Sequence, residues 1–314
     1  MKIRYGIVFL IMIIVCASCG CTDSGVKTDP ADSQVPAISV ETRNYTLSEL
    51  KAFVHEARNF AIRSGVEAAA KAFNDPEGDF VNGTMYIYAL DYEGNYIAHP
   101  FNQDLIGTNG IELTDANGMR FVEACRDVAE SGGGYILYSY PNPSDNMKPA
   151  EKIGYVEPIN NESWLGSGIY LDDLVGENGE SPDDLAYVKD FIINASVFAE
   201  SVPMDEAIAG FCDTEGQFYD AGTGMYVIAI DYEGNILAHP STDIIGENIY
   251  DNEMKYGVKS IQRASEIAAD GGGFIIYGYD SFGYLEQNLN YIMPVEKDDY
   301  WIISSETSLT KLLM

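Results

Sequence analysis

The sequence predicts an α+β fold in which one module occurs twice in tandem, each module with an antiparallel sheet flanked by helices. The segment Ala89–Pro100 (ALDYEGNYIAHP) returns as Ala229–Pro240 (AIDYEGNILAHP). Further along, Gly132–Tyr138 (GGGYILY) returns as Gly271–Tyr277 (GGGFIIY). Because the matching segments keep the same order in both halves, we infer an internal duplication.

The N-terminus has the pattern of an export signal. A basic start precedes the short uncharged run Tyr5–Ser18, and small residues and cysteines follow. The run is shorter than the roughly 20 residues that cross a bilayer as a helix. We therefore expect residues 1–21 to be a signal peptide with a lipoprotein processing site. Cys21 is the preferred lipidated residue, Cys19 is the alternative, and an uncleaved anchor is a further alternative.

The composition indicates an extracellular location and excludes one class of partner. Residues 22–44 are polar and rich in Asp, Ser and Pro, which predicts a flexible linker. The chain has 49 Asp and Glu against 18 Lys and Arg, a formal net charge of −31. Such a surface repels nucleic acids, so we expect no nucleic-acid partner. We expect the protein at the cell surface, anchored by its N-terminal lipid to the outer face of the cytoplasmic membrane.

Each predicted module, residues 45–176 and residues 181–314, opens with a long helix. In the first module, Thr46 and Glu49 form a capping-box pattern ahead of apolar residues at helical spacing. In the second module, Ser181 is followed by Pro182, the pattern of an N-cap with proline at the first helical position.

After each long helix we expect a hairpin, a short helix and further strands. The hairpin turn is the repeated Glu-Gly-Asn, and its second strand ends at His-Pro. The triple glycine ends the short helix before the next strand. The last strands surround Tyr155 and Trp164, or Tyr291 and Trp301. The first hairpin strands are predicted to span residues 85–90 and 225–230. The short helices are predicted over about 118–131 and 255–270, and the following strands over 135–140 and 274–279.

The combination of these motifs resembles the Cache family of extracellular PAS-like sensor domains. It includes Asp91–Asn95 before Ala-His-Pro, Asp115–Gly118, the glycine-rich bend, and Trp164–Tyr170. The resemblance is closest to the single-Cache type, present twice. It implies a five- or six-stranded antiparallel sheet with a pocket for a small carboxylate, amino acid or similar metabolite. The second copy departs from the pattern, because Ser304–Thr307 replaces Gly166–Ile169 and Asp115–Gly118 has no counterpart.

The candidate ligand-binding residues combine repeated histidines, strand tyrosines and scarce basic residues. His99 and His239 occupy the same place in both repeats, where an imidazole can act at a pocket rim or cap a strand. Tyrosines at alternating strand positions either line a pocket or pack in the core. Arg120 and Lys152 are candidates for a carboxylate clamp, the alternative being exposed ion pairs. The full set is Tyr86, Tyr88, His99, Arg120, Tyr138, Lys152 and Tyr155 in the first module, and Tyr226, His239, Tyr277 and Tyr291 in the second.

Several kinds of chemistry are not supported by the motifs. The triple glycines lack a Gly-Lys-Ser/Thr element, and Asp91–Asn95 is too short for a calcium-binding loop. No metal-ligand spacing or nucleophile motif is present. We expect no catalytic residues, no metal and no cofactor, and we expect Cys125 and Cys212 to be free thiols rather than a disulfide.

The sequence therefore predicts a surface lipoprotein that binds a small extracellular solute and is not an enzyme. The chain ends at Met314, right after the second module, so we expect any signal to pass through a separate membrane receptor or transporter. The alternative is a structural or adhesive cell-envelope protein without a ligand. A cavity lined by His99, Tyr138 and Tyr155 would favour binding, whereas an interior filled with bulky apolar side chains would favour the alternative.

Overall fold

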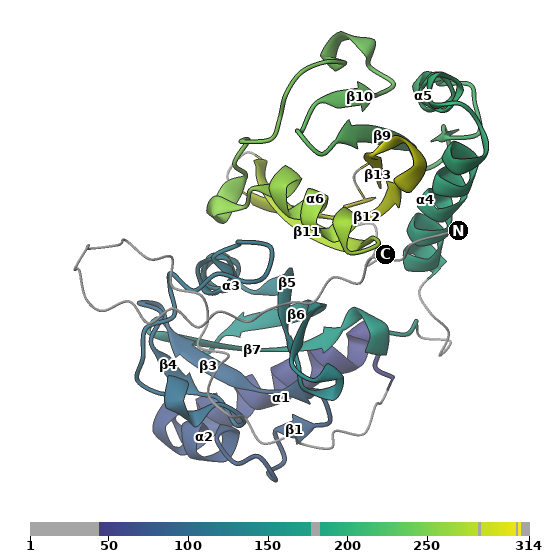
Figure 1. Ribbon diagram of the computed structural model, residues 1–314. Helices are drawn as coiled ribbons and strands as arrows, with labels where there is room; N and C mark the ends of the chain where they lie inside the picture. Colours follow the sequence, from purple (N-terminus) through teal and green to yellow (C-terminus); the bar gives the residue numbers. More distant parts are fainter. Residues whose placement is uncertain (1–43, 177–182, 282–283, 306, 309–314) are drawn as a thin grey trace, which may run out of the picture.

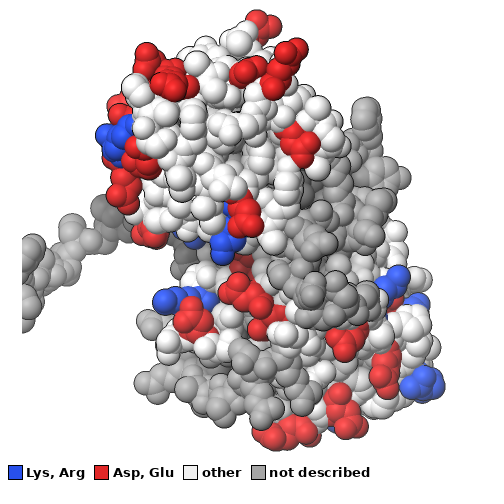
Figure 2. All heavy atoms as spheres, turned by 90° about the vertical axis from the view of Figure 1, so that its right-hand side faces the viewer, with Lys and Arg blue, Asp and Glu red and all other residues white. Residues whose placement is uncertain are grey.

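The computed structural model describes residues 44–176, 183–281, 284–305 and 307–308 (Figure 1). The predicted signal peptide, Cys19, Cys21 and almost all of the predicted linker lie outside these residues. We call residues 44–176 the N-terminal half and residues 183–308 the C-terminal half. No helix in the described residues is both long enough and apolar enough to cross a membrane. Acidic side chains outnumber basic ones on the face shown in Figure 2, as the composition requires.

The N-terminal half is an antiparallel sheet with helices on both faces. The strand order in the sheet is β4-β3-β7-β6-β5. The helices are α1 (Leu47–Ser64), α2 (Val66–Phe73) and α3 (Phe121–Glu130), with short turns of 3₁₀ helix at Gln103–Leu105, Pro143–Asp145 and Leu171–Asp173. The strands are β1 (Val81–Asn82), β2 (Met85–Tyr86), β3 (Tyr88–Asp91), β4 (Tyr96–Ala98), β5 (Gly134–Asn142), β6 (Lys148–Pro158) and β7 (Ser163–Tyr170).

The C-terminal half repeats this strand order as β10-β9-β13-β12-β11. Its helices are α4 (Asp183–Ser201), α5 (Met204–Cys212) and α6 (Ser260–Ala269), with 3₁₀ turns at Thr242–Ile244, Lys255–Gly257 and Glu296–Asp298. Its strands are β8 (Tyr219–Asp220), β9 (Met225–Asp231), β10 (Ile236–Ala238), β11 (Gly273–Ser281), β12 (Tyr284–Val295), β13 (Tyr300–Ser304) and β14 (Thr307–Ser308). The predicted α+β class with antiparallel sheets is confirmed. The C-terminal sheet has seven strands rather than the expected five or six, because β8 pairs with β9 and β14 pairs with β12.

The long helix α1 begins where its capping box predicts. The Thr46 hydroxyl accepts a hydrogen bond from the Glu49 backbone at 3.1 Å, and the Glu49 carboxylate accepts one from the Thr46 backbone at 2.8 Å. Leu50 and Val54 lie on the buried stripe and pack on one face of the sheet. The predicted start of the second long helix, at Ser181 and Pro182, lies outside the described residues.

Both short helices start later than predicted. In the N-terminal half, the Asp115 carboxylate accepts hydrogen bonds from the backbones of Asn117 and Met119, each at 2.9 Å, so residues 115–119 form a loop and α3 starts at Phe121. In the C-terminal half, Tyr256 has a left-handed backbone with φ of 62°, so the 3₁₀ turn is separate from α6. Side-chain hydrogen bonding and a backbone reversal therefore interrupt the helical pattern.

The two halves are joined by a side chain that covers a sheet edge. Strand β5 is at the edge of the N-terminal sheet. The Gln287 amide, from β12 of the C-terminal half, accepts a hydrogen bond from the Leu137 backbone N–H and donates one to the Leu137 carbonyl, each at 2.6 Å. Gln287 thus takes the place of a neighbouring strand, which would otherwise have to satisfy these backbone groups.

Replacing Gln287 by alanine is expected to lower the free energy of unfolding by about 2 kcal/mol, because Leu137 then keeps two buried backbone groups without partners. Urea denaturation followed by circular dichroism measures the change. Gln262→Ala is the control, since the Gln262 amide donates to Asp251 at an exposed position. Equal stability of the two variants would contradict this role of Gln287.

Candidate functional site

One face of the N-terminal sheet carries the candidate site, and strand alternation decides which residues reach it. Ile87 and Ala89 are in the core cluster formed with α1, whereas their neighbours Tyr86, Tyr88 and Leu90 point to the opposite face. That opposite face is covered by α3, which packs on β5 and β6. The site is therefore enclosed between the sheet and α3.

Glycines leave room on this face of the sheet. A Cβ atom on Gly154 would lie 2.8 Å from the Tyr138 ring, and one on Gly166 would lie 2.7 Å from the Tyr88 hydroxyl. A Cβ atom on Gly168 would lie 2.9 Å from the Lys152 side chain. The tyrosine and lysine side chains thus fold over positions that have no side chain of their own.

A cavity lies between these residues and α3, with about 330 Å³ of empty space that includes open solvent. Most of its lining is aromatic, and Phe121, Val122 and Cys125 come from α3. The remaining lining residues come from the strands and the segment after β4: Tyr86, Tyr88, Leu90, Tyr96, His99, Tyr138, Tyr140 and Trp164. Of the predicted site residues, the structure brings Tyr86, Tyr88, His99 and Tyr138 together here.

Lys152 adjoins the cavity as a buried cation. Its side chain is 2% exposed, and its Nζ lies 4.6 Å from the ring centroids of Tyr86 and of Tyr170 and 5.8 Å from that of Tyr140. Lys152 and Tyr138 are opposite each other on β6 and β5, so they share a sheet face. Burial lowers the pKa of the Lys152 amine to about 7, and the nearby Asp173 carboxylate opposes this shift.

His99 lies at the cavity and also caps the chain after β4. Its Nδ1 accepts a hydrogen bond from the Asn102 backbone at 3.0 Å, which caps the chain after β4. The neutral ring therefore carries its proton on Nε2, which lies 3.5 Å from the Tyr140 hydroxyl in the cavity. Burial and the neighbouring Lys152 lower the pKa of His99 to about 3, so the ring is neutral at physiological pH.

The cavity has a polar end and an apolar end. Trp164 lies at the start of β7 and pairs with Leu90, whereas Tyr170 lies at the other end of β7 and pairs with Lys152. Trp164 and Tyr170 are six positions apart in an extended strand, roughly 20 Å. The lysine and imidazole groups thus lie at one end with the rings of Tyr86 and Tyr140, and the Trp164 indole and Leu90 lie at the other, where Tyr88 packs against the indole.

Two predicted residues of the first module lie away from the cavity. Tyr155 is three residues after Lys152 on β6, so strand alternation turns it to the opposite face of the sheet, toward α1. There its ring packs against that of Tyr135, with 4.7 Å between the ring centroids. Arg120 caps the start of α3, and its guanidinium Nε donates to Glu123 at 2.6 Å, so its charge is already paired. Neither side chain lines the cavity.

The predicted residues of the second module do not form an equivalent aromatic site. Tyr226 stacks on Tyr219 and packs edge-on against His239, whose Nδ1 accepts from the Ser241 backbone at 2.9 Å. Tyr291 faces the α4 side, where it packs on Phe274. The side chain of Tyr277 lies outside the described residues.

Larger side chains occupy the glycine positions of the C-terminal sheet. By strand register, Ile303 replaces Gly166, and it is 6% exposed. In the same register Asn290 replaces Gly154 and Ser305 replaces Gly168, and both are buried. The Ser305 hydroxyl accepts from the Tyr226 backbone at 2.9 Å, and the Asn290 amide donates to the Ser304 carbonyl at 2.6 Å. These side chains fill the face that is open in the N-terminal half.

Sequence reasoning missed several residues of the site. Tyr140, Phe121 and Trp164 line the cavity, and Tyr170 covers Lys152. Tyr140 is two residues after Tyr138 on β5, so strand alternation alone placed it on the same face. The contribution of α3 depends on tertiary packing, for which the sequence holds no comparable signal.

A mostly aromatic cavity with a few polar groups at one end is the arrangement of a small-molecule binding domain. A Cache domain family model matches residues 67–310. The chain therefore belongs to the Cache domain family. Cache domains are extracellular or periplasmic sensor domains that bind small ligands and are linked to membrane receptors; enzymatic activity is not typical of the family.

Similar proteins include receptors of two kinds. The sensor histidine kinase MctS of Rhizobium johnstonii is 33% identical over 94 residues, which are 30% of this chain and 20% of that protein. The match thus spans about a fifth of the kinase's length. A methyl-accepting chemotaxis protein from Vibrio parahaemolyticus is 27% identical with a TM-score of 0.36, covering 40% of this chain and 88% of that chain. The ligand-binding domain of the Pseudomonas fluorescens chemoreceptor CtaA is 15% identical with a TM-score of 0.28, covering 85% and 86%.

Replacing Gly166 by alanine is expected to destabilise the fold by about 1–3 kcal/mol, because the new methyl group forces the Tyr88 hydroxyl out of place. Ser167→Ala is the control on the same strand but the opposite face. The Ser167 hydroxyl is buried without a hydrogen-bond partner, so its removal is expected to be neutral or stabilising. Thermal unfolding distinguishes the two, and equal melting temperatures would show that the glycine is not needed for space.

Proposed function

We propose that the N-terminal half binds a small monocarboxylate with a short apolar tail. The observation that carries this proposal is the buried amine of Lys152 at the polar end of an aromatic cavity. A ligand carboxylate would pair with the amine and accept a hydrogen bond from His99 Nε2, while its tail would lie toward Trp164 and Leu90. Charge-assisted hydrogen bonds in such a dry site are stronger than in water.

The lining also favours a monocarboxylate over an amino acid. None of the described residues that line the cavity is acidic, and the nearby Asp173 carboxylate already accepts from Thr84 and interacts with the Lys152 amine, so an α-ammonium group would lack a counter-ion of its own. Burying an unpaired ammonium group is costly.

We further propose that the chain carries two Cache modules in tandem on a lipid-anchored exported protein, and that a separate membrane receptor or transporter reads its ligand state. The repeated strand order and the repeated Asp-Tyr-Glu-Gly-Asn hairpin support the tandem arrangement. The N-terminal signal pattern supports the anchor. In this proposal the first module is the ligand-binding one, because the second is filled at the glycine positions.

Propionate is expected to raise the melting temperature of the protein, since a ligand of the native state stabilises it by mass action. Alanine, propionamide and propylamine are the matched comparisons: the first adds an ammonium group, the second removes the charge and the third reverses it. All three are expected to shift the melting temperature less. Flat melting curves for acetate, propionate, butyrate, lactate and pyruvate would contradict the proposal.

Lys152→Met is expected to weaken propionate binding at least tenfold while leaving stability unchanged or increased, because it removes a buried charge and keeps the volume. Isothermal titration calorimetry measures the affinity. Lys51→Met is the control, since the Lys51 amine lies 5.8 Å from the Tyr155 ring, on the other face of the sheet. Undiminished affinity in Lys152→Met would reject the site.

Propionate affinity is expected to fall as the pH rises above about 7, by about tenfold per pH unit until the pKa of bound Lys152 is reached. The carboxylate selects the charged amine, whose pKa in the free protein is about 7, and the ligand itself is ionised above about pH 5. His99 stays neutral across this range. Calorimetry between pH 6 and pH 9 tests this, with K152M as the variant that should lose the pH slope.

A further inference from the structure

A tyrosine of the C-terminal half packs in the buried cluster that surrounds the N-terminal cavity. Tyr256, in the 3₁₀ turn before α6, is 5% exposed and belongs to the same buried cluster as Phe121, Tyr138 and Trp164. Val258, two residues on, is fully buried in that cluster. In Figure 1 this turn approaches α3, the helix that closes the cavity.

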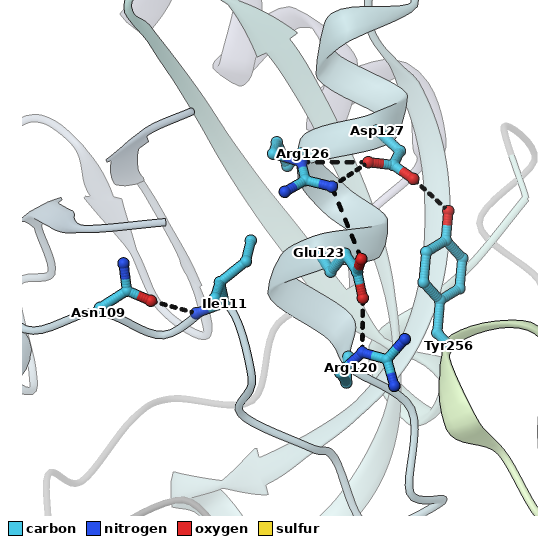
Figure 3. Close-up of polar contacts among 7 residues, drawn as sticks. All are labelled: Asn109, Ile111, Arg120, Glu123, Arg126, Asp127 and Tyr256. Atoms are coloured by element: carbon cyan, nitrogen blue, oxygen red, sulfur yellow. Dashed lines mark hydrogen bonds and ion pairs between the residues drawn. The ribbon is translucent and has the colours of Figure 1, made fainter. Parts of the chain in front are cut away.

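Tyr256 contacts α3 at two points one and a half to two turns apart. Its carbonyl accepts a hydrogen bond at 3.1 Å from the backbone N–H of Arg120, the N-cap residue of α3. Its hydroxyl donates to the Asp127 carboxylate at 2.8 Å, as Figure 3 shows. Between these points lie Phe121, Val122 and Cys125, which line the cavity.

The carboxylate that receives the Tyr256 hydroxyl is itself held in place. Arg126 donates to Asp127 at 2.8 Å, and the same guanidinium lies 3.8 Å from Glu123, which pairs with Arg120 (Figure 3). The charges thus alternate along one side of α3 and end at the tyrosine. Such a chain of paired groups resists reorientation of any one member.

The backbone of Tyr256 is adapted to this contact at a local cost. Its φ of 62° and ψ of 21° lie in the left-handed region, which a residue with a side chain rarely adopts. The next residue is Gly257, and a Cβ atom there would lie 3.1 Å from the Arg120 guanidinium. The turn therefore has the conformation that brings both the carbonyl and the hydroxyl of Tyr256 to α3.

We infer that Tyr256 is a positioning residue through which the C-terminal half holds α3 against the cavity and so sets the ligand affinity of the N-terminal half. The inference rests on the proposed function for the identity of the ligand but not for the contact itself. By thermodynamic linkage, a ligand that draws α3 closer also strengthens the contact with Tyr256. The C-terminal half thereby detects the occupancy of a cavity that it does not line with its own sheet.

The first test needs no ligand. Tyr256→Ala is expected to speed hydrogen exchange of the α3 amides, because it removes the ring and the hydroxyl that hold the turn against α3. Tyr256→Phe keeps the ring and loses only the hydrogen bond to Asp127, so we expect a smaller increase in exchange. Because this variant keeps the core packing, it tests the contact even if the alanine variant does not fold. Tyr250→Phe is the control, since its hydroxyl has no hydrogen-bond partner among the described residues. Unchanged exchange of α3 in Tyr256→Ala would overturn the inference.

The second test uses propionate. Tyr256→Ala is expected to weaken its affinity about tenfold and Tyr256→Phe less, because a smaller fraction of the free protein then has α3 in place. In the wild-type protein, saturating propionate is expected to slow exchange of the Met254 amide, which is bonded to Val258 in the same turn. A merely structural tyrosine would give no ligand-dependent change there, and either unchanged affinity or unchanged exchange would contradict the inference. Absence of propionate binding in the wild type would instead refute the proposed function and leave the first test valid.

Discussion

The site depends on the absence of side chains from three positions on one face of the N-terminal sheet. Gly154, Gly166 and Gly168 leave the space over which Tyr138, Tyr88 and Lys152 fold. In a strand, glycine loses packing and backbone entropy, so such positions weaken the sheet unless the space is used. The C-terminal half shows the opposite choice, because Asn290, Ile303 and Ser305 fill the same positions. One fold therefore gives an open face in one half and a packed face in the other.

The second constraint is the burial of Lys152 among tyrosine rings. Tyrosine faces attract a cation but do not replace its hydration, which is why the pKa of the amine falls to about 7. The folded protein binds this proton less tightly than the unfolded chain, so this group makes the fold more stable as the pH rises from about 7 toward its ordinary pKa of 10.5. Stability and affinity for an anion thus change in opposite directions with pH. A residue that lowers the stability of the fold but increases the affinity for an anion is typical of a binding site.

Much of the fold follows from sequence patterns, whereas the site does so only in part. The capping box of α1, the hairpins and the strands rest on local signals, and the structure has them close to the expected positions. His99, Tyr86, Tyr88 and Tyr138 reach the cavity because strand period and repeat position are local properties too. Tyr155 does not reach the cavity, because the register of β6 turns it to the other face of the sheet. Arg120 does not reach it either, because its guanidinium pairs with Glu123 one turn further along α3. The contact of Tyr256 with α3 joins residues far apart in the sequence, and no spacing rule indicates it.

The central claim is that the Lys152 amine is a buried, partly neutral group that becomes charged when a carboxylate enters the cavity. Nuclear magnetic resonance titration of the lysine side chains, in the free and the propionate-saturated protein, measures the pKa of Lys152 most directly. The signal of Lys152 is identified as the one that is missing in K152M. We expect a lysine with a pKa of about 7 in the free protein, and we expect this pKa to rise on saturation with propionate. A Lys152 that titrates near the ordinary lysine pKa of about 10.4, unchanged by propionate, would contradict it.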